Sequence, residues 1–293
     1  MTFSKFIHLV LPPLFFKAKR KMCAKPEARI TPMPKLEKES NTMVVIGNGP
    51  SLKESLKKYG EKIKKYDSIV VNYFAATDEY VALKPKYYAF ADPMWFGGKK
   101  ELKAAVKGLW GNLIEKTTWP LTIIVPEYAR GMELEGALSV NPNIRFAYYS
   151  NSNYQPWEKV DLELLDRNLV APPSQTVVSL CTWFAIYQGY ENTYLIGADT
   201  SFVADLKVDQ QTNIVYTIDQ HFYNNQEVYK DTGLFDANHC KKYGMKMSAI
   251  FEDVGGMFKD YDLLARYAAW KGVGLYNASE YSWIDALERK KIE

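Results

Sequence analysis

The sequence predicts an α/β fold, in which a doubly wound, mainly parallel, Rossmann-like sheet carries a long active-site loop. Apolar, β-branched runs of strand length alternate with helical patterns along most of the chain. The first such run ends in a Gly-Asn-Gly-Pro turn that opens a helical pattern. With 293 residues and 47% hydrophobic residues, the chain is also long and apolar enough for one large domain.

The first strand and the turn after it organise the prediction. Residues 43–46 are a short apolar run, Gly47 to Pro50 break it, and Ser51 is a good N-cap for a helix whose apolar face extends to Ile63. A strand that enters a glycine turn and a helix start leaves N–H groups at its carboxyl end, where they suit a phosphate. An ordinary turn, with glycines present only for their positive φ, is the alternative.

The remaining elements continue the alternation. The expected strands are 68–72, 86–91, 121–125, 143–149, 193–196 and 273–277. The expected helices are 77–83, 99–110, 174–188, 258–270 and 281–289. Residues 150–173 are expected to form a loop, and a longer loop without a helix is expected at about 200–256. A loop of that length in a compact domain is usually functional or mobile.

The N-terminal residues differ from the rest. Residues 1–22 contain an apolar run, interrupted by Pro12 and Pro13, followed at once by a basic cluster at 17–21. The run is too short to span a bilayer, and its charge order is the reverse of a secretory signal. We expect this segment to lie on an anionic membrane surface, with a poorly ordered tail as the alternative. Residues 23–42 are expected to be a linker, and 43–293 one α/β domain.

Charge and cysteine content exclude some classes. The net charge of +3 gives no overall field that would favour nucleic acid as a partner. Cys23, Cys181 and Cys240 are far apart in the sequence and have no metal-binding or redox spacing, which indicates a reducing compartment. Cys181 is expected in the core. No metal site is assigned, because His239 and Cys240 offer only two ligands.

Polar residues at strand ends are the candidate ligand contacts, because such ends carry the site in this fold class. They are Asn48, Ser51, Asn72, Asp92 and Asp199.

The long loop supplies the candidate base. His221 lies among polar and aromatic residues, with Asp219 close enough in sequence to orient its ring and Tyr223 shortly after it. A histidine with a carboxylate partner can act as a general base near neutral pH. A surface histidine within an aromatic cluster is the alternative, and His239 is a second candidate.

Several segments together resemble bacterial sialyltransferases that use CMP-sialic acid, and equally a wider group containing flagellin-glycosylating transferases and hydroxymethylpterin pyrophosphokinase-like proteins. They are Gly-Asn-Gly-Pro-Ser-Leu at 47–52, Val-Val-Asn-Tyr-Phe at 70–74, the segment 189–199 ending in Gly-Ala-Asp, and Gly-Leu-Tyr-Asn-Ala-Ser at 274–279. The resemblance covers roughly residues 43–289 in order.

The resemblance implies a transferase that binds a nucleotide-sugar donor, CMP-linked in the sialyltransferases, without an obligatory metal or other cofactor. Gly47, Asn48, Gly49 and Ser51 would lie at the phosphate or sugar, Asn72 at the nucleotide or donor sugar, and Ser174 or Thr176 near the nucleotide. The chain departs from the pattern where the sialyltransferases place tyrosines after the segment matching 197–199. Here the residues are Thr-Ser-Phe at 200–202, so that Tyr216 or Tyr223 would have to fill that role. Their catalytic histidine also lies where this chain has Gly255-Gly256.

Two functions remain open at this stage. The first is a glycosyltransferase that acts on a glycan or lipid-linked glycan acceptor, in the cytoplasm at the inner membrane surface, with His221 as the base. The second is a Mg²⁺-dependent pyrophosphokinase, with Asp92 and Asp199 as metal ligands. A non-catalytic nucleotide-binding module is a third option, and a homo-oligomer is not excluded.

Overall fold

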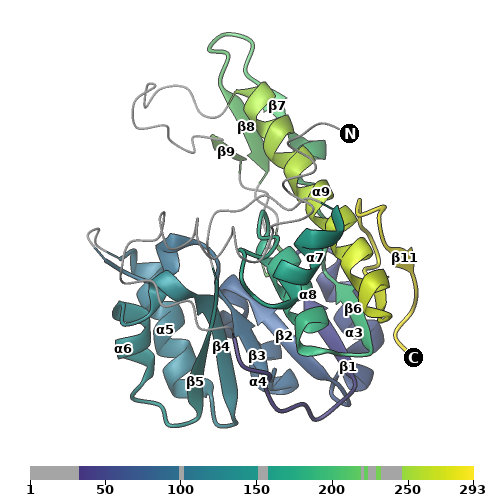
Figure 1. Ribbon diagram of the computed structural model, residues 1–293. Coiled ribbons are helices and arrows are strands. Elements are labelled where there is room, and N and C mark those ends of the chain that lie inside the picture. The colour runs from purple at the N-terminus through teal and green to yellow at the C-terminus, as the bar shows by residue number, and fades with distance from the viewer. Residues whose placement is uncertain (1–32, 99–101, 151–157, 219–220, 224–228, 232–245) are drawn as a thin grey trace, which may run out of the picture.

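A computed structural model of the chain describes residues 33–98, 102–150, 158–218, 221–223, 229–231 and 246–293 (Figure 1). Its main sheet has eight strands in the order β11-β10-β6-β1-β2-β3-β4-β5. Each neighbouring pair in this sheet is parallel. The strands are β1 Thr42–Ile46, β2 Asp67–Val71, β3 Tyr87–Ala89, β4 Leu121–Pro126, β5 Ile144–Tyr149, β6 Asn192–Ile196, β10 Gly274–Asn277 and β11 Glu288–Arg289.

Helices cover both faces of this sheet. One face packs against α3 Leu52–Ile63, α4 Asp78–Leu83, α5 Ala104–Lys116 and α6 Glu133–Leu138. The other face packs against α7 Glu158–Asp166, α8 Val177–Gln188 and α9 Met247–Lys271. Short 3₁₀ helices connect elements: η1 Asn72–Ala76, η2 Pro93–Trp95, η3 Glu127–Ala129 and η4 Phe202–Asp205. The predicted doubly wound, Rossmann-like α/β fold is therefore confirmed.

The central strand shows why the sequence folds this way. Met43 and Val45 of β1 point into one core, and Val44 and Ile46 point into the other. A strand buried on both faces must be apolar at every position, which is the continuous run seen in the sequence. Strand β1 pairs with β2 on one side and β6 on the other, so the connections diverge at its carboxyl end. Ligands of open α/β sheets bind in the crevice at such a point.

A smaller lobe projects beyond this edge (Figure 1). It is an antiparallel sheet of β7 Lys207–Val208, β8 Val215–Ile218 and β9 Tyr229–Asp231. Val215 packs with Ile250 and Val254 from the first half of α9. The expectation of no helix before residue 258 was therefore wrong. Helix α9 begins at Met247 and continues through Gly255 and Gly256, because burial of these side chains stabilises its N-terminal half.

Three other expected elements also differ. Helix α5 occupies Ala104–Lys116 instead of 99–110, and α7 lies within the segment that we expected to be a loop. No helix forms at 281–289. That segment instead makes tertiary hydrogen bonds, such as Trp283 N–H to the Asp199 carbonyl at 2.9 Å, before β11. Local periodicity does not reveal such competing bonds.

The described part of the expected linker packs on the domain. Met33 is buried, and the Tyr187 hydroxyl donates to its carbonyl oxygen at 2.5 Å. The Asn41 carbonyl accepts from Glu191 N–H at 2.8 Å, just before β1 begins. Residues 1–22, where we expect membrane contact, lie outside the described residues. Within the described ranges, no helix is long and apolar enough to cross a membrane.

Candidate functional site

The turn after β1 lies tightly against the turn after β6. Gly47 N–H donates to the Ile196 carbonyl and Gly49 N–H to the Gly197 carbonyl, both at 2.9 Å. A Cβ atom on Gly47 would lie 2.4 Å from the Gly197 oxygen, and one on Gly49 2.3 Å from Asp199 Oδ1. Neither Gly47 nor Gly49 has a positive φ. Close approach of two backbones, and not unusual dihedral angles, therefore requires these glycines.

Asp199 occupies the N-terminus of α3. Its Oδ2 accepts from Ser51 N–H at 2.9 Å, and its Oδ1 accepts from the Ser51 hydroxyl at 2.6 Å. The side chain is only 5% exposed, and burial raises the pKa of its carboxyl, opposed by the bonds from Ser51. A carboxylate at this place satisfies orphan N–H groups and lies at the positive end of the helix dipole.

This carboxylate changes what the turn offers a ligand. The N–H groups of Gly47, Gly49 and Ser51 are all engaged within the protein, and Leu52 N–H donates to the Gly49 carbonyl at 3.0 Å. The free N–H groups that we expected at these positions are therefore not found. A phosphate in this crevice would need other donors, or would have to displace Asp199.

Asn48, between the two glycines, has an unused acceptor. Its Nδ2 donates to the Val71 carbonyl at 3.0 Å, which ties the turn to the end of β2. The residue is 7% exposed, and its Oδ1 has no hydrogen-bond partner within the described part of the chain. Buried polar atoms are nearly always satisfied in folded proteins, so this oxygen suits a donor supplied by a bound molecule.

The candidate base lies next to Asn48. Phe222 N–H donates to the Asn48 carbonyl at 3.1 Å, and His221 and Tyr223 are the residues directly before and after Phe222. The rings of His221 and Tyr223 stack with centroids 5.0 Å apart. Phe222 and Phe74 have ring centroids 5.7 Å apart. The structure thus brings the segment 221–223 to the carboxyl end of β1, whereas Asp219 and His239 lie outside the described residues.

Two residues at strand ends have left-handed backbones. Asn72, directly after β2, and Thr200, directly after Asp199, both have φ of 52°. For threonine, whose side chain is β-branched, this conformation is a genuine outlier. Strained residues of this kind cluster at functional sites. Sequence reasoning selected Asn72 but missed Thr200, because a backbone dihedral angle leaves no local signal in a threonine.

The N-terminus of α8 repeats the arrangement at α3. Thr176 caps the helix through its Oγ1, which accepts from Ser179 N–H at 3.0 Å, while Ser174 is exposed on the preceding segment. Asp260 of α9 accepts from Gln175 N–H at 2.9 Å and from the Ser179 hydroxyl at 3.0 Å. Burial raises the pKa of the Asp260 carboxyl. Sequence reasoning missed Asp260, which lies in an ordinary charged stretch of helix.

The two carboxylates considered for a metal have different surroundings. Asp92 is exposed and accepts from Met94 N–H at 2.9 Å, whereas Asp199 is buried against Ser51. In the described part of the chain, no group of three or more histidine, cysteine, aspartate or glutamate side chains could hold a metal ion. The pyrophosphokinase alternative therefore has no observation in its favour.

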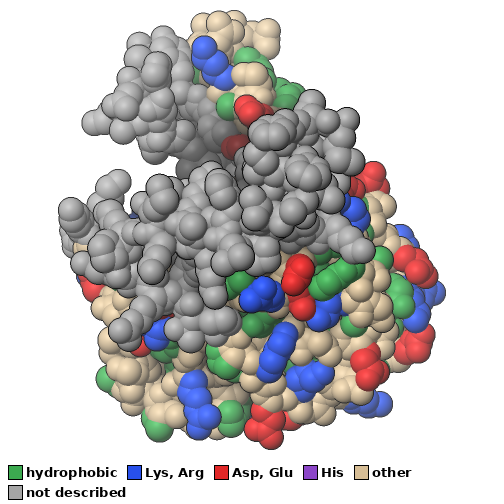
Figure 2. All heavy atoms as spheres, in the orientation of Figure 1, with side chains coloured by type: hydrophobic (Ala, Val, Ile, Leu, Met, Phe, Trp, Pro, Cys, Tyr) green, Lys and Arg blue, Asp and Glu red, His purple; other side chains and the backbone are tan. Residues whose placement is uncertain are grey.

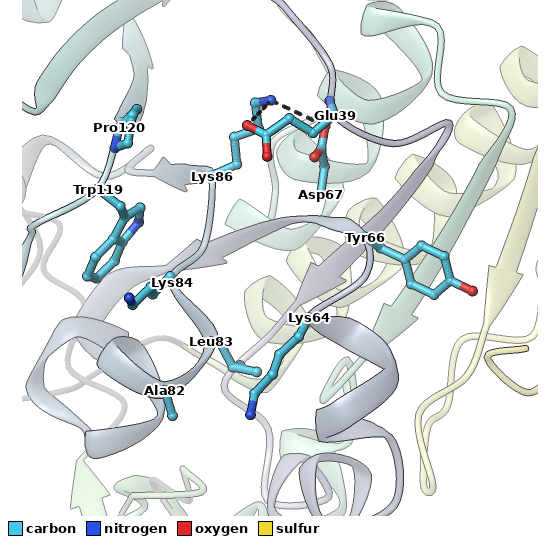
Figure 3. A pocket seen from close by; sticks show the side chains of 10 residues that line it. All are labelled: Glu39, Lys64, Tyr66, Asp67, Ala82, Leu83, Lys84, Lys86, Trp119 and Pro120. Atoms are coloured by element: carbon cyan, nitrogen blue, oxygen red, sulfur yellow. Dashed lines mark hydrogen bonds and ion pairs between the residues drawn. The ribbon is translucent and has the colours of Figure 1, made fainter.

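A pocket of about 470 Å³ lies at the opposite, amino edge of the sheet (Figure 3). Its wall includes Asp67 at the start of β2, and Lys86 just before β3. Lys86 Nζ lies 2.8 Å from Glu39 Oε1 and 3.8 Å from Asp67 Oδ2. These charges are already compensated within the protein, so the carboxyl edge remains the candidate site. On the face in Figure 2, described acidic and basic side chains are intermingled.

The fold and the bonds between these strand ends define a Rossmann-like α/β protein with its candidate site at the carboxyl ends of β1, β2 and β6. No family model matches the chain, and no curated protein matches it. Among solved structures, the chain is similar to the MAf glycosyltransferase from Magnetospirillum magneticum AMB-1, with a TM-score of 0.50 and 14% sequence identity. The match covers 90% of this chain but only 36% of that one, so it concerns the shared fold.

Proposed function

We propose that this chain is a glycosyltransferase that moves a sugar from a nucleotide-sugar donor to a hydroxyl group of a glycan acceptor. The fold supports the class, since a solved structure with this fold is a glycosyltransferase. The observation that carries the proposal is the buried Asn48 Oδ1, which has no hydrogen-bond partner among the described residues, next to the segment that holds His221. Sugar transfer needs one group that holds the nucleotide-sugar donor and, close to it, a second group that takes the proton from the acceptor hydroxyl.

Each residue has a distinct part in the proposed reaction. Asn48 Oδ1 accepts a hydrogen bond from a hydroxyl or amino group of the donor, which fixes the donor at the end of β1. His221 takes the proton from the acceptor hydroxyl as its oxygen attacks the anomeric carbon. The bond from that carbon to the phosphate oxygen breaks, and its electron pair leaves with the phosphate. In this proposal, Tyr223 donates a hydrogen bond to the departing oxygen.

The proposed donor is a sugar linked to CMP. CMP-linked sialic acid and related ulosonic acids are the first candidates, because their activated bond leaves a good phosphate leaving group without metal assistance. Turnover in such a reaction should continue in EDTA. Loss of turnover that Mg²⁺ restores would instead require a metal-assisted leaving group.

Thermal shift with CMP, UDP, GDP and ATP tests whether the protein binds the nucleotide of the donor. A ligand that binds only the folded state raises the melting temperature, and at a hundredfold excess over Kd it contributes about 2.7 kcal/mol. We expect one nucleotide class to raise the melting temperature of the wild type but not of Asn48→Ala. Asn168→Ala is the control, since Asn168 is also buried but lies at the end of α7. Equal shifts in wild type and Asn48→Ala would remove Asn48 from the site.

A further inference from the structure

The segment between β10 and β11 places two exposed aromatic side chains beside the candidate site. Residues 278–287 pass from the carboxyl end of β10 to the edge strand β11, in the yellow part of Figure 1. Tyr281 is 52% exposed and Trp283 is 40% exposed. Single exposed apolar residues are common on protein surfaces, so exposure alone carries no argument. The way in which these two are held is more informative.

Hydrogen bonds fix this segment at both residues. Trp283 Nε1 donates to the Tyr281 hydroxyl at 2.6 Å, which joins the two side chains. Trp283 N–H donates to the Asp199 carbonyl at 2.9 Å, and the Ser282 hydroxyl to the Ala198 carbonyl at 2.6 Å. The aromatic surface is therefore largely ordered before anything binds, which lowers the entropic cost of binding.

The same bonds join the aromatic pair to the site. Asp199, whose carbonyl accepts from Trp283, also binds Ser51 through both carboxylate oxygens. The Ser51 hydroxyl oxygen lies 3.3 Å from the Tyr281 carbonyl oxygen. Ser51 belongs to the same turn as Asn48. The backbone of Tyr281 and Trp283 is thus bonded to Ser51 and Asp199, next to the turn at which the donor is proposed to bind.

The chemistry of the surface fits a sugar ring. Each pyranose ring has a face of C–H groups, which pack on the electron-rich face of indole or phenol, while its hydroxyls need polar partners at the rim. The carboxylates of Glu280 and Asp285 lie on this segment beside the two aromatic residues. Glu280 Oε1 lies 2.7 Å from Lys58 Nζ, so an acidic and a basic side chain both lie next to the aromatic pair. The surface is open, which suits a chain that continues into solvent better than a nucleobase that needs enclosure.

We propose that Tyr281 and Trp283 form an acceptor subsite that stacks a sugar ring of a glycan chain next to the transfer site. This inference rests on the proposed glycosyltransferase function and names where its acceptor binds. The subsite orients the acceptor from one side while the donor occupies the crevice at Asn48. Donor binding and acceptor binding are then separable, because they use different side chains.

The test uses the full-length protein on a printed array of bacterial surface oligosaccharides. Three proteins are compared: the wild type, the double variant Tyr281→Ala with Trp283→Ala, and Trp270→Ala. Trp270 is the matched control, because it is 42% exposed but lies near the end of α9. We expect the double variant to bind the glycans selected by the wild type roughly tenfold to a hundredfold more weakly, as for removal of a stacked aromatic side chain. Trp270→Ala should bind them normally.

Nucleotide binding and membrane binding are measured in parallel. Of CMP, UDP, GDP and ATP, the nucleotide that raises the melting temperature of the wild type should raise that of the double variant by the same amount. Vesicles of phosphatidylserine and phosphatidylcholine should also bind both equally. Trp283→Phe keeps an aromatic face without the indole N–H, and it should retain most of the glycan binding if stacking is the main contact.

The outcomes separate this inference from the proposed function. Glycan binding by the wild type without any nucleotide response would contradict the donor site and leave the acceptor subsite standing. Equal glycan binding by wild type and double variant, or none by the wild type, overturns the subsite. Selective loss of nucleotide binding would make the pair a nucleobase contact, and selective loss of vesicle binding would make it a membrane contact; either result also overturns it.

Discussion

At the scale of single residues, the site depends on which polar atoms are used and which remain available. Asp199 satisfies the start of α3, so its carboxylate takes the place at which a ligand anion was expected. Asn48 Oδ1 remains without a partner in the described structure, and His221 lies beside the bond that joins Phe222 to Asn48. Asp199 is therefore assigned a structural role, and Asn48 and His221 are proposed for ligand binding and proton transfer.

The role of His221 gives the first prediction. In the proposed reaction, His221→Ala should lower turnover by roughly 10²- to 10⁴-fold while nucleotide affinity changes little. His221→Gln keeps a hydrogen-bonding group without the basicity, so its turnover should fall almost as far as that of His221→Ala. Steady-state kinetics and nucleotide thermal shifts on both variants check this. Near-normal turnover in folded His221→Ala would exclude the base role, and a matching loss of nucleotide affinity would make His221 a donor contact.

The pKa of Asp199 gives a prediction about stability and pH. Burial raises its pKa above the ordinary value of 3.8, so the native state holds this proton more tightly than the unfolded chain. The contribution of this group to the free energy of unfolding is then greatest below pH 3.8, and it is lost as the pH rises through the raised pKa.

Asp199→Asn isolates this contribution, because asparagine has the same shape and does not titrate. Urea unfolding of both proteins across this pH range measures it, with Asp260 titrating identically in each. We expect the wild type to lose stability relative to the variant as the pH rises. The opposite slope would mean that the bonds from Ser51 outweigh burial and lower the pKa.

At the scale of elements, close packing of two turns determines where the crevice can form. The strand-to-helix turn after β1 and the turn after β6 approach so closely that side chains at Gly47 and Gly49 would meet Gly197 and Asp199. The alternative reason for these glycines, a positive φ, is wrong, because neither has one, and close backbone contact explains them instead. Substitution here should therefore affect folding before it affects any ligand.

Gly49→Ala tests the packing directly. A Cβ atom 2.3 Å from Asp199 Oδ1 forces a shift in a buried hydrogen-bonded group, and overpacking of this kind costs roughly 1–3 kcal/mol. Gly108→Ala is the control: Gly108 lies within α5, its Cβ position has no other atom within 4 Å, and the change should stabilise by about 0.5–1 kcal/mol. Thermal melts of both variants measure the difference. Equal melting temperatures would contradict the packing argument.

At the scale of the whole molecule, the candidate site and the proposed membrane contact involve different parts of the chain. The candidate site lies at the carboxyl ends of neighbouring strands of the sheet, and the lobe of β7, β8 and β9 stands beyond this edge (Figure 1). The apolar run and basic cluster of residues 1–22 lie outside the described structure, so their proposed contact with the inner membrane surface stays a prediction. It matters for function, because a surface-bound enzyme meets a lipid-linked acceptor at high local concentration.

Deletion of residues 1–22 tests this contact. The truncated protein should bind phosphatidylserine-containing vesicles much less than the full chain, because each basic residue near an anionic surface contributes about 1 kcal/mol. Its melting temperature and nucleotide response should stay unchanged. Vesicle sedimentation measures the binding, and vesicles of phosphatidylcholine alone are the control. Equal sedimentation of both proteins on anionic vesicles would refute the proposal.

The sequence by itself determined the fold class and grouped the candidate site residues at one edge of the sheet. Runs such as 43–46 must be buried on both faces, and the alternation of such runs with helical patterns requires parallel strands. Parallel strands end at one edge, which is why Asn48, Asn72 and Asp199 could be grouped without coordinates. These inferences depend on local hydrophobicity and on chain geometry, both of which the sequence records.

Only the tertiary structure decided what those residues contact. Asp199 reaches Ser51 across 148 sequence positions, and its carboxylate there binds both the N–H and the hydroxyl of the N-cap residue of α3. Trp283 N–H bonds to Asp199 where local pattern favoured a helix, and Ile250 and Val254 extend α9 through two glycines. Each outcome depends on partners distant in sequence, whose energies exceed the weak local preferences that a sequence pattern expresses.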